Sequence, residues 1–253
     1  MKIGDTNINF IVLIGGITIV IAALLAFVQH DIKKVLAYST VSQLGYMMMG
    51  LGAGAWLPAV FHIFTHAFFK ACLFLSAGSV SHSGSHHSFD MKKDMGGLAK
   101  KMPITATTWI ISTLALAGVF PLAGFFSKDE IIDNVGYGGY NAFMIVGLSG
   151  AFLTAAYMTR ATYLTFFGKA RGAAAGEHHD EHDAHADAHD SHDAHATHDA
   201  HDSHDAHGAD HGPHESPKLI TVPLMILAAL ALVAGLSNAT PFGESWERFK
   251  KYV

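Results

Sequence analysis

The sequence is poor in charge and almost devoid of cysteine. Of its 253 residues only 15% are Asp, Glu, Lys or Arg, whereas soluble domains are charged at about one residue in four. Cys72 is the single cysteine and lies in an apolar run, which excludes a disulfide scaffold. No cysteine cluster, Rossmann glycine motif or haem motif is present in the sequence. The net charge of -5 excludes a strongly basic nucleic-acid-binding protein.

The few charges that are present are unevenly distributed. Residues 177–215 hold 12 of the 21 acidic residues, 13 of the 19 histidines and no Lys or Arg. The remaining 214 residues carry a net charge of +7. The protein is therefore an apolar, mildly basic chain with one acidic, histidine-rich insert, which argues against an ordinary soluble domain.

Six apolar segments dominate the rest of the chain. A membrane-spanning helix needs about 20 predominantly apolar residues. Each of the six has 19 to 27 residues and at most one charged side chain, and they cover Phe10–Val28, Val35–Ala55, Trp56–Ser81, Pro103–Ser127, Asn141–Phe167 and Leu219–Ser237. Six such segments in 253 residues are more than the core of a soluble protein contains. The sequence predicts an all-α, polytopic transmembrane helix bundle.

The connections between these segments differ in basic content. The first, third and fifth connections are rich in Lys and Arg, whereas the second and fourth are poor in them. By the positive-inside rule the basic connections, and with them the histidine-rich insert, face the cytoplasm. The tail then falls on the outer side with Arg248, Lys250 and Lys251, against the rule.

Three polar side chains recur at helical spacing inside the third apolar segment. His62, His66 and Lys70 stand at positions i, i+4 and i+8, which places them on one helix face. A charge within a span costs about 3 kcal/mol on insertion scales, so the placement favours function. The structural alternative is a histidine pair satisfied by neighbouring helices, with Lys70 reaching an interface. Metal binding is disfavoured because an adjacent ammonium repels a cation. Histidine and lysine instead suit a proton relay.

A second candidate lies in the sequence FPLAGFFSKDEI at residues 120–131. Pro121 removes a backbone donor and Gly124 loosens the chain, so the helix is expected to break here. Ser127-x-x-Glu130 fits a capping box that restarts a helix at Ser127, with Lys128 in the first turn. The positive end of the helix dipole disfavours a charged amine there. Two placements stay open for Lys128: an ion path at membrane depth or an outer loop.

A third candidate is the polar segment HDIKKVLAYSTVSQLGYM at residues 30–47. Asp31, Lys33 and Lys34 at its start are interpreted as interfacial anchors. The polar residues that follow are unusual for a helix exposed to lipid and predict a buried helix along a hydrated path; they are Tyr38, Ser39, Ser42 and Gln43.

At these motifs the chain resembles a known family. HDIKKVLAYSTVSQLGYM, FHIFTHAFFKACLFLSAGSV, the Gly-Gly-Leu at 96–98 and LAGFFSKDEI are similar to the antiporter-like membrane subunits of respiratory complex I, in particular subunit L of NADH:quinone oxidoreductase. The resemblance covers about residues 10–170. Mrp-type cation/proton antiporters and membrane-bound hydrogenases share a looser version of these motifs.

The resemblance implies a fold and roles for individual residues. Residues 1–170 would form the second of two inverted five-helix repeats, with one discontinuous helix. Lys70 would lie at the centre of a hydrated half-channel, and Lys128 would be the terminal residue on the exit side. The neighbours of the central lysine would be His62 and His66, and Asp31 and Lys33 would follow with lower weight.

The resemblance also implies a larger assembly. The chain itself would carry no cofactor, while NADH, FMN, Fe–S clusters and quinone would bind partner subunits. Partners would be other membrane subunits of complex I, above all antiporter-like ones, and the lipid bilayer of the bacterial inner membrane. Because the family's first repeat and final helices are missing, we expect the chain to be a C-terminal-half fragment, a truncated gene product or one half of a split gene.

The histidine-rich insert falls within residues 171–217, which we predict to be a disordered cytoplasmic loop, followed at 218–253 by a sixth transmembrane helix and a truncated tail. Two other interpretations stay open. One is a charge reversal of the loop as its histidines become protonated. The other is weak, adventitious binding of Zn²⁺, Ni²⁺ or Cu²⁺ at histidines such as His182, His185, His189 and His192.

The sequence therefore favours a proton-translocating subunit of NADH:quinone oxidoreductase, in which no redox site lies on this chain. An Mrp-type antiporter subunit is the alternative within the same class. A metal transporter with a histidine-rich loop and a purely structural scaffold belong to other classes. The metal transporter requires ligands inside the spans without cationic neighbours, which Lys70 contradicts.

Overall fold

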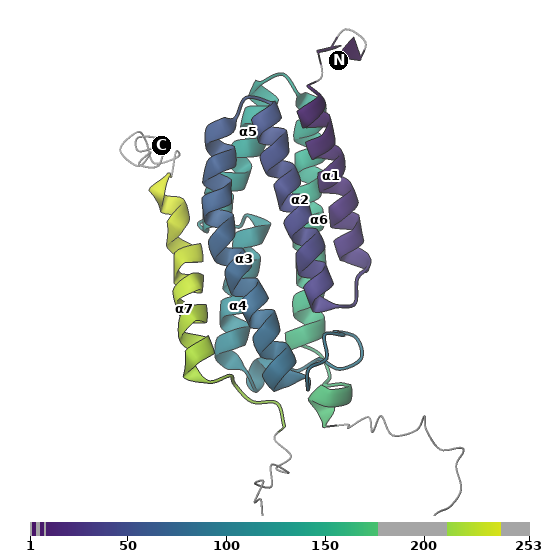
Figure 1. Ribbon diagram of the computed structural model, residues 1–253, viewed down its shortest axis with the longest axis vertical. Helices are drawn as coiled ribbons and strands as arrows, with labels where there is room; N and C mark the ends of the chain where they lie inside the picture. The colour runs from purple at the N-terminus through teal and green to yellow at the C-terminus, as the bar shows by residue number, and fades with distance from the viewer. Residues whose placement is uncertain (1, 4–5, 8, 177–211, 239–253) are drawn as a thin grey trace, which may run out of the picture.

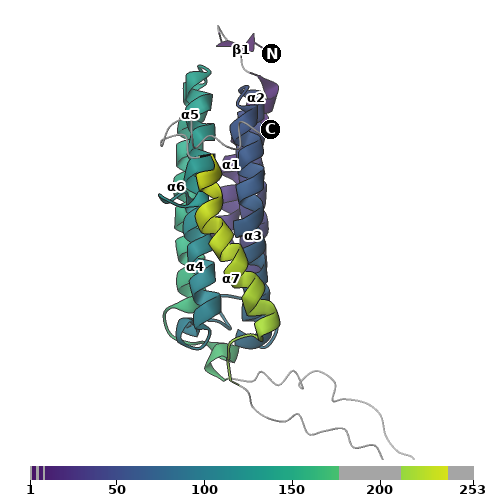
Figure 2. The same ribbon diagram turned by 90° about the vertical axis from the view of Figure 1, so that its left-hand side faces the viewer.

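The structure, a computed structural model, is a bundle of helices aligned with its long axis (Figure 1; Figure 2). It describes residues 2–3, 6–7, 9–176 and 212–238. The helices in chain order are α1 (Phe10–Val28), α2 (Ile32–Gly52), α3 (Trp56–Gly84), α4 (Pro103–Ala117), α5 (Glu130–Tyr137), α6 (Asn141–Phe166) and α7 (Lys218–Val233). The shorter elements are the antiparallel pair β1 (Lys2–Ile3) and β2 (Thr6–Asn7), the 3-10 helices η1 (Leu98–Lys100), η3 (Gly172–Ala175) and η4 (Ala234–Ser237), and the π-helix η2 (Phe125–Asp129).

The predicted class, a helical membrane bundle, is confirmed. Within the described part of the chain four helices are long and apolar enough to cross a membrane: α1, α3, α6, and α7 together with η4. The 21-residue helix α2 is also long enough, at about 31 Å, but it carries buried Ser39, Ser42 and Gln43. Helix α4 is apolar but only 15 residues long, because the predicted fourth segment is interrupted.

Apolar side chains cover the outside of the bundle. Ile21 of α1, Phe152 of α6 and Leu219 of α7 are 53%, 75% and 86% exposed. Such a surface is unfavourable in water and suited to lipid. Away from the helix ends, polar side chains of α2 and α3 such as Gln43 and Lys70 are instead buried between helices, so the chain has the polarity pattern of a membrane protein.

The basic connections all lie at one end of the bundle. Because the helices alternate in direction, the connections α1–α2 and α3–α4 lie at the lower end of Figure 1, together with the C-terminal end of α6 and the N-terminal end of α7. We call this the basic end. That it faces the cytoplasm stays a prediction. Arg171 fastens this end by donating hydrogen bonds from Nε to the Met95 carbonyl and from Nη2 to the Leu164 and Met91 carbonyls.

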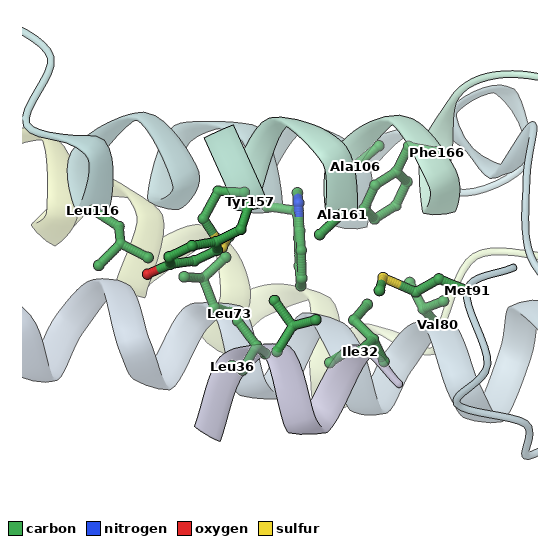
Figure 3. Packing of buried hydrophobic residues seen from close by; sticks show 14 of the residues in the cluster. Ile32, Leu36, Leu73, Val80, Met91, Ala106, Leu116, Tyr157, Ala161 and Phe166 are labelled. Carbon is green, nitrogen blue, oxygen red and sulfur yellow. The ribbon is translucent and has the colours of Figure 1, made fainter. Parts of the chain in front are cut away.

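Two packing features hold the helices in register. Helices α1 and α2 approach closely at Gly45, where a Cβ would lie 2.9 Å from the backbone nitrogen of Ile19. The largest apolar cluster of the described residues lies between α2, α3, α4 and α6, and Figure 3 shows Leu36, Leu73, Leu116 and Tyr157 among its members.

Candidate functional site

The three predicted polar residues of α3 share one buried face. His62, His66 and Lys70 are 1%, 9% and 5% exposed. The rings of His62 and His66 have centroids 5.8 Å apart, and Lys70 follows one turn later. Because the face points to α2 and η2, the Lys70 amine lies inside the bundle and does not extend toward a helix end.

Lys70 is held by two groups of α2, one of which also bonds α6. Its Nζ donates hydrogen bonds to Ser39 Oγ at 2.7 Å and to the Leu36 carbonyl at 3.1 Å, both on α2. The Tyr157 hydroxyl of α6 donates to the same Ser39 Oγ at 2.7 Å. Ser39 thus accepts from both side chains, and its own proton is left to reorient.

His62 connects α3 to α2 and to the interrupted helix. Its Nε2 lies 3.1 Å from Gln43 Oε1, and its Nδ1 lies 2.9 Å from Ser127 Oγ. Thr65 Oγ1 donates to the same Ser127 oxygen at 2.8 Å. Since the Gln43 oxygen only accepts, neutral His62 carries its proton on Nε2, and Nδ1 is free to accept from Ser127.

Two buried polar atoms at this face have no hydrogen-bond partner within the described residues: Gln43 Nε2 and His66 Nε2. Buried polar groups are as a rule satisfied by protein or by ordered water. The face between Lys70 and His62 therefore has the chemistry of a hydrated surface.

Lys128 is fully buried, which makes the outer-loop placement wrong. Its Nζ donates to the Leu116 carbonyl at 3.0 Å and to the Ala117 carbonyl at 3.4 Å. These are the last carbonyls of α4, which lack partners within their own helix. The negative end of the α4 dipole is electrostatically favourable for an ammonium ion. Nζ also lies 5.6 Å from the centre of the Tyr46 ring.

The predicted capping box at Ser127 is wrong. The chain leaves the helix after Ala117, and helical structure has already resumed when the π-helix η2 begins at Phe125. Ser127 Oγ is bonded to the Ala123 carbonyl, His62 and Thr65, so it does not cap a helix start. Lys128 consequently faces the end of α4 and not the start of a new helix.

The interruption depends on a close backbone approach. A Cβ on Gly124 would lie 1.8 Å from the carbonyl oxygen of Ala115, a separation that no side chain tolerates. Gly118 ends α4 in the left-handed conformation with φ of 85°. The two glycines let the chain fold back on α4, which brings Lys128 to the exposed carbonyls.

Asp31 and Lys33 lie apart from this buried face. Asp31 is the N-cap of α2 and accepts a hydrogen bond from the Lys34 backbone nitrogen at 3.0 Å. Lys33 is exposed, and its amine lies 3.7 Å from the centre of the Phe89 ring. Both stand at the basic end, as the anchor interpretation places them.

Sequence reasoning missed two members of the site. Tyr157 lies in an apolar segment, where an aromatic side chain is more often a packing residue. Thr65 was not singled out although it lies between His62 and His66. Its position one turn from His62 on the same helix was the available signal.

Other candidate sites are not supported near this face. In the part of the chain that the structure describes, no group of three His, Cys, Asp or Glu side chains is placed to hold a metal ion. His182, His185, His189 and His192 lie outside the described residues. A pocket of about 410 Å³ between α4 and α7 is lined mainly by apolar side chains and includes none of the candidate residues.

Comparison with known proteins places these residues in a family. The family described as NADH:quinone oxidoreductase/Mrp antiporter, TM (transmembrane), matches residues 2–154. The chain is 42% identical to NAD(P)H-quinone oxidoreductase chain 5 of a Picosynechococcus species, an alignment that covers 95% of this chain and 35% of that protein. It is 40% identical to NADH-quinone oxidoreductase subunit L of Neisseria meningitidis over 95% of this chain and 33% of that protein.

The fold has a solved counterpart. A chain in the structure of the membrane-bound sulfane sulfur reductase, an archaeal respiratory membrane complex, superposes with a TM-score of 0.72 at 28% identity, covering 96% of this chain and 34% of that one. The chain thus spans about a third of the length of these relatives. With its family match, its helical bundle and its buried lysines, this protein belongs to the NADH:quinone oxidoreductase/Mrp antiporter family of transmembrane subunits.

Proposed function

We propose that this chain is part of a proton-translocating membrane subunit, in which Lys70, His66, His62 and Lys128 carry protons. One observation carries the proposal: two lysine amines lie inside a membrane bundle with neutral oxygens as their hydrogen-bond partners. Ionisable groups inside a membrane protein are costly and typically functional. The histidine face of α3 joins the two amines, since His62 is bonded to Ser127, the residue before Lys128.

The His62–Ser127 contact supplies a two-state element. While His62 is neutral, the Ser127 hydroxyl donates a hydrogen bond to its Nδ1. When a second proton reaches His62, Nδ1 becomes a donor, and the Ser127 hydroxyl turns to the Ala123 carbonyl at 3.1 Å. A proton taken up at Nδ1 and released from Nε2 leaves the ring neutral in its other tautomer, with the proton on Nδ1, and the return of the ring to the first tautomer resets the site.

The Ser39 hydroxyl likewise adapts its hydrogen bond to the charge state of Lys70. A hydroxyl both accepts and donates, so it satisfies the ammonium by accepting and the neutral amine by donating. Lys70 therefore changes its charge without losing its hydrogen-bond partner. The distance along α3 from His62 to Lys70 is about 12 Å, or two turns. His66 lies between them, and water bound to its unpartnered Nε2 would connect the two residues.

The wider setting of the chain belongs to the same proposal. As part of a NADH:quinone oxidoreductase in a bacterial inner membrane, the chain moves protons while NADH, FMN, Fe–S clusters and quinone react on partner subunits. The named relatives support this setting over an Mrp-type antiporter, although the family includes both. Partners are the neighbouring antiporter-like subunits and the repeat that the longer relatives carry.

The proposal is tested in membrane vesicles that contain the whole complex. Lys70→Ala is expected to lower NADH-driven proton pumping by at least about tenfold, and quinone reduction is expected to fall with it because the two are coupled. Lys33→Ala is the matched control, since Lys33 is exposed at the basic end. Wild-type pumping by an assembled Lys70→Ala complex would contradict the proposal. Sodium-driven proton movement without NADH would favour the Mrp-type function instead.

A further inference from the structure

Helix α3 carries a second set of buried polar side chains on its opposite face. Ser79 follows Lys70 by nine residues, which is about two and a half turns of helix and therefore half a turn around the axis. Ser79 and its neighbours face α4, and α7 crosses over both helices here (Figure 2). We call this set the hydroxyl seam; all its members are less than 9% exposed, and they are Ser76, Ser79, Ser83, Thr105, Thr108, Ser112 and Ser216.

The seam begins at the basic end with a carboxylate. Glu215 accepts hydrogen bonds from the Ile104 backbone nitrogen at 2.7 Å and from Thr105 Oγ1 at 2.6 Å. Thr105 Oγ1 lies 3.1 Å from Ser79 Oγ, which lies 2.6 Å from Ser216 Oγ. Because an ionised carboxylate only accepts, Thr105 donates to it and Ser79 in turn donates to Thr105. Protonation of Glu215 would reverse this order.

Farther along the seam Thr108 donates to carbonyls of its own helix, whereas other hydroxyls lack such a partner. Ser76 Oγ and Ser112 Oγ are fully buried and unpartnered within the described residues, as is Thr113 Oγ1 beside them. The Cys72 thiol touches both serines, but a thiol is a weak hydrogen-bonding group. Buried hydroxyls of this kind normally bind ordered water. Three of them on adjoining turns of α3 and α4 make a polar interior at this depth.

The seam ends at Lys128. Ser112 precedes Leu116 by one helical turn, and the Leu116 carbonyl accepts from Lys128 Nζ. Thr113 precedes Ala117, the second carbonyl that Lys128 contacts, by the same interval. One turn rises about 5.4 Å along the helix axis. The last hydroxyls of the seam therefore lie about one turn of α4 before the carbonyls that hold the Lys128 amine, and water between them would complete a path to Nζ.

We propose that the hydroxyl seam is a second proton path, which leads from Glu215 at the basic end to Lys128 without passing through Lys70. A proton from bulk water binds Glu215, each hydroxyl and water accepts one proton and passes on its own, and the neutral Lys128 amine becomes an ammonium. Glu215 is then a carboxylate again, so charge and protons balance. The inference rests on the proposed function, because it names the group that supplies Lys128.

The test uses variants of the intact complex in vesicles that expose the basic end to the medium. In Glu215→Gln the amide oxygen in place of Oε2 still accepts from the Ile104 and Thr105 backbone nitrogens, and the amide NH2 in place of Oε1 donates to Thr105 Oγ1. The contacts at the start of α4 are thus kept while the titratable group is lost. The double variant Ser76→Ala with Ser112→Ala removes two hydroxyls whose one hydrogen-bonding contact within the described residues is the weakly bonding Cys72 thiol. Each is expected to lower the number of protons pumped per NADH oxidised, because the seam then delivers none to Lys128 while the histidine face of α3 still does.

The matched control is Thr165→Val, which removes a buried, unpartnered hydroxyl of α6 outside the seam. It is expected to pump at the wild-type rate. Normal pumping by an assembled Glu215→Gln complex and by the double serine variant would overturn the inference. If Glu215→Gln fails to assemble, the serine variant alone decides.

The two proposals fail differently. If Lys70→Ala stops pumping while the seam variants pump normally, only the second path is refuted. If Lys70→Ala pumps normally, the proposed function itself fails. A loss seen in Glu215→Ala but not in Glu215→Gln would show that Glu215 caps α4 and carries no proton.

Discussion

Lys70 and Lys128 have the same side chain and are both buried, but the backbone around them differs. Lys70 lies within the continuous helix α3, and its amine is held by a hydroxyl and a carbonyl of α2. Lys128 lies in a π-helix after an interruption, and its amine is held by two carbonyls at the end of α4. A buried amine on an intact helix is thus bonded by a neighbouring helix, whereas a buried amine at an interruption is bonded by the carbonyls that the interruption leaves free.

The difference has a chemical consequence. Ser39 Oγ satisfies Lys70 in either charge state, because a hydroxyl both donates and accepts. The carbonyls of Leu116 and Ala117 only accept, and the negative end of α4 adds a favourable field for an ammonium ion. We therefore expect Lys70 to exchange protons readily and Lys128 to hold its proton until a change nearby releases it.

The largest effect is expected where the interrupted helix folds back on α4, because only the Lys128 region depends on that close approach. In Gly124→Ala the new Cβ would collide with the Ala115 carbonyl, so the free energy of unfolding is expected to fall by about 3 kcal/mol or more. Thermal unfolding and assembly of the purified complex measure the effect. Gly78→Ala is the control, because a Cβ there meets nothing within 4 Å. Equal stability of the two variants would show that the close approach at Gly124 is unimportant.

A smaller effect is expected at the continuous helix. Ser39→Ala removes the hydroxyl partner of Lys70 and Tyr157. The free energy of unfolding is expected to fall by about 2 kcal/mol, which is typical of a lost hydrogen bond to a charged group. Pumping should slow severalfold as Lys70 loses a partner for its neutral form. Ser149→Ala controls for loss of a serine, since Ser149 is exposed and bonded within its own helix. Unchanged pumping would separate Ser39 from the relay.

The smallest effect is expected from Tyr157→Phe. Tyr157 contacts Ser39 and not Lys70 itself, so the variant removes one neutral hydrogen bond of about 1 kcal/mol. Pumping should stay within about twofold of wild type. Tyr163→Phe, at a residue that is 60% exposed, is the control. A loss as large as that of Ser39→Ala would mean that Tyr157 takes part in proton transfer directly.

The sequence predicted the face of α3 because that prediction needed only helical periodicity. His62, His66 and Lys70 follow a spacing of four, and a helix converts that spacing into one stripe whatever surrounds it. The polar residues of α2 were predicted to be buried for a similar reason, since Ser39 and Gln43 are too polar for lipid. Local rules were sufficient for both helices.

The same kind of rule failed at Ser127. The Ser127-x-x-Glu130 spacing satisfies a capping box, but the chain reaches Ser127 already in helical conformation. Tertiary partners took the hydroxyl, because His62 and Thr65 of α3 lie beside it. Pro121 and Gly124 marked the region of the interruption, yet α4 ends earlier, at Ala117. A break is visible in sequence, whereas its ends depend on what packs against them.

The sequence by itself determined that the chain is a membrane bundle, roughly where its helices run and which residues of α3 share a face. These properties follow from apolar length and from the helical repeat, both of which are local. Only the tertiary structure decided the hydrogen-bond partners: Ser39 for Lys70, Ser127 for His62 and the end of α4 for Lys128. Ser39 and Tyr157 are 118 residues apart in the chain, and no local pattern records a contact that exists only because helices pack side by side.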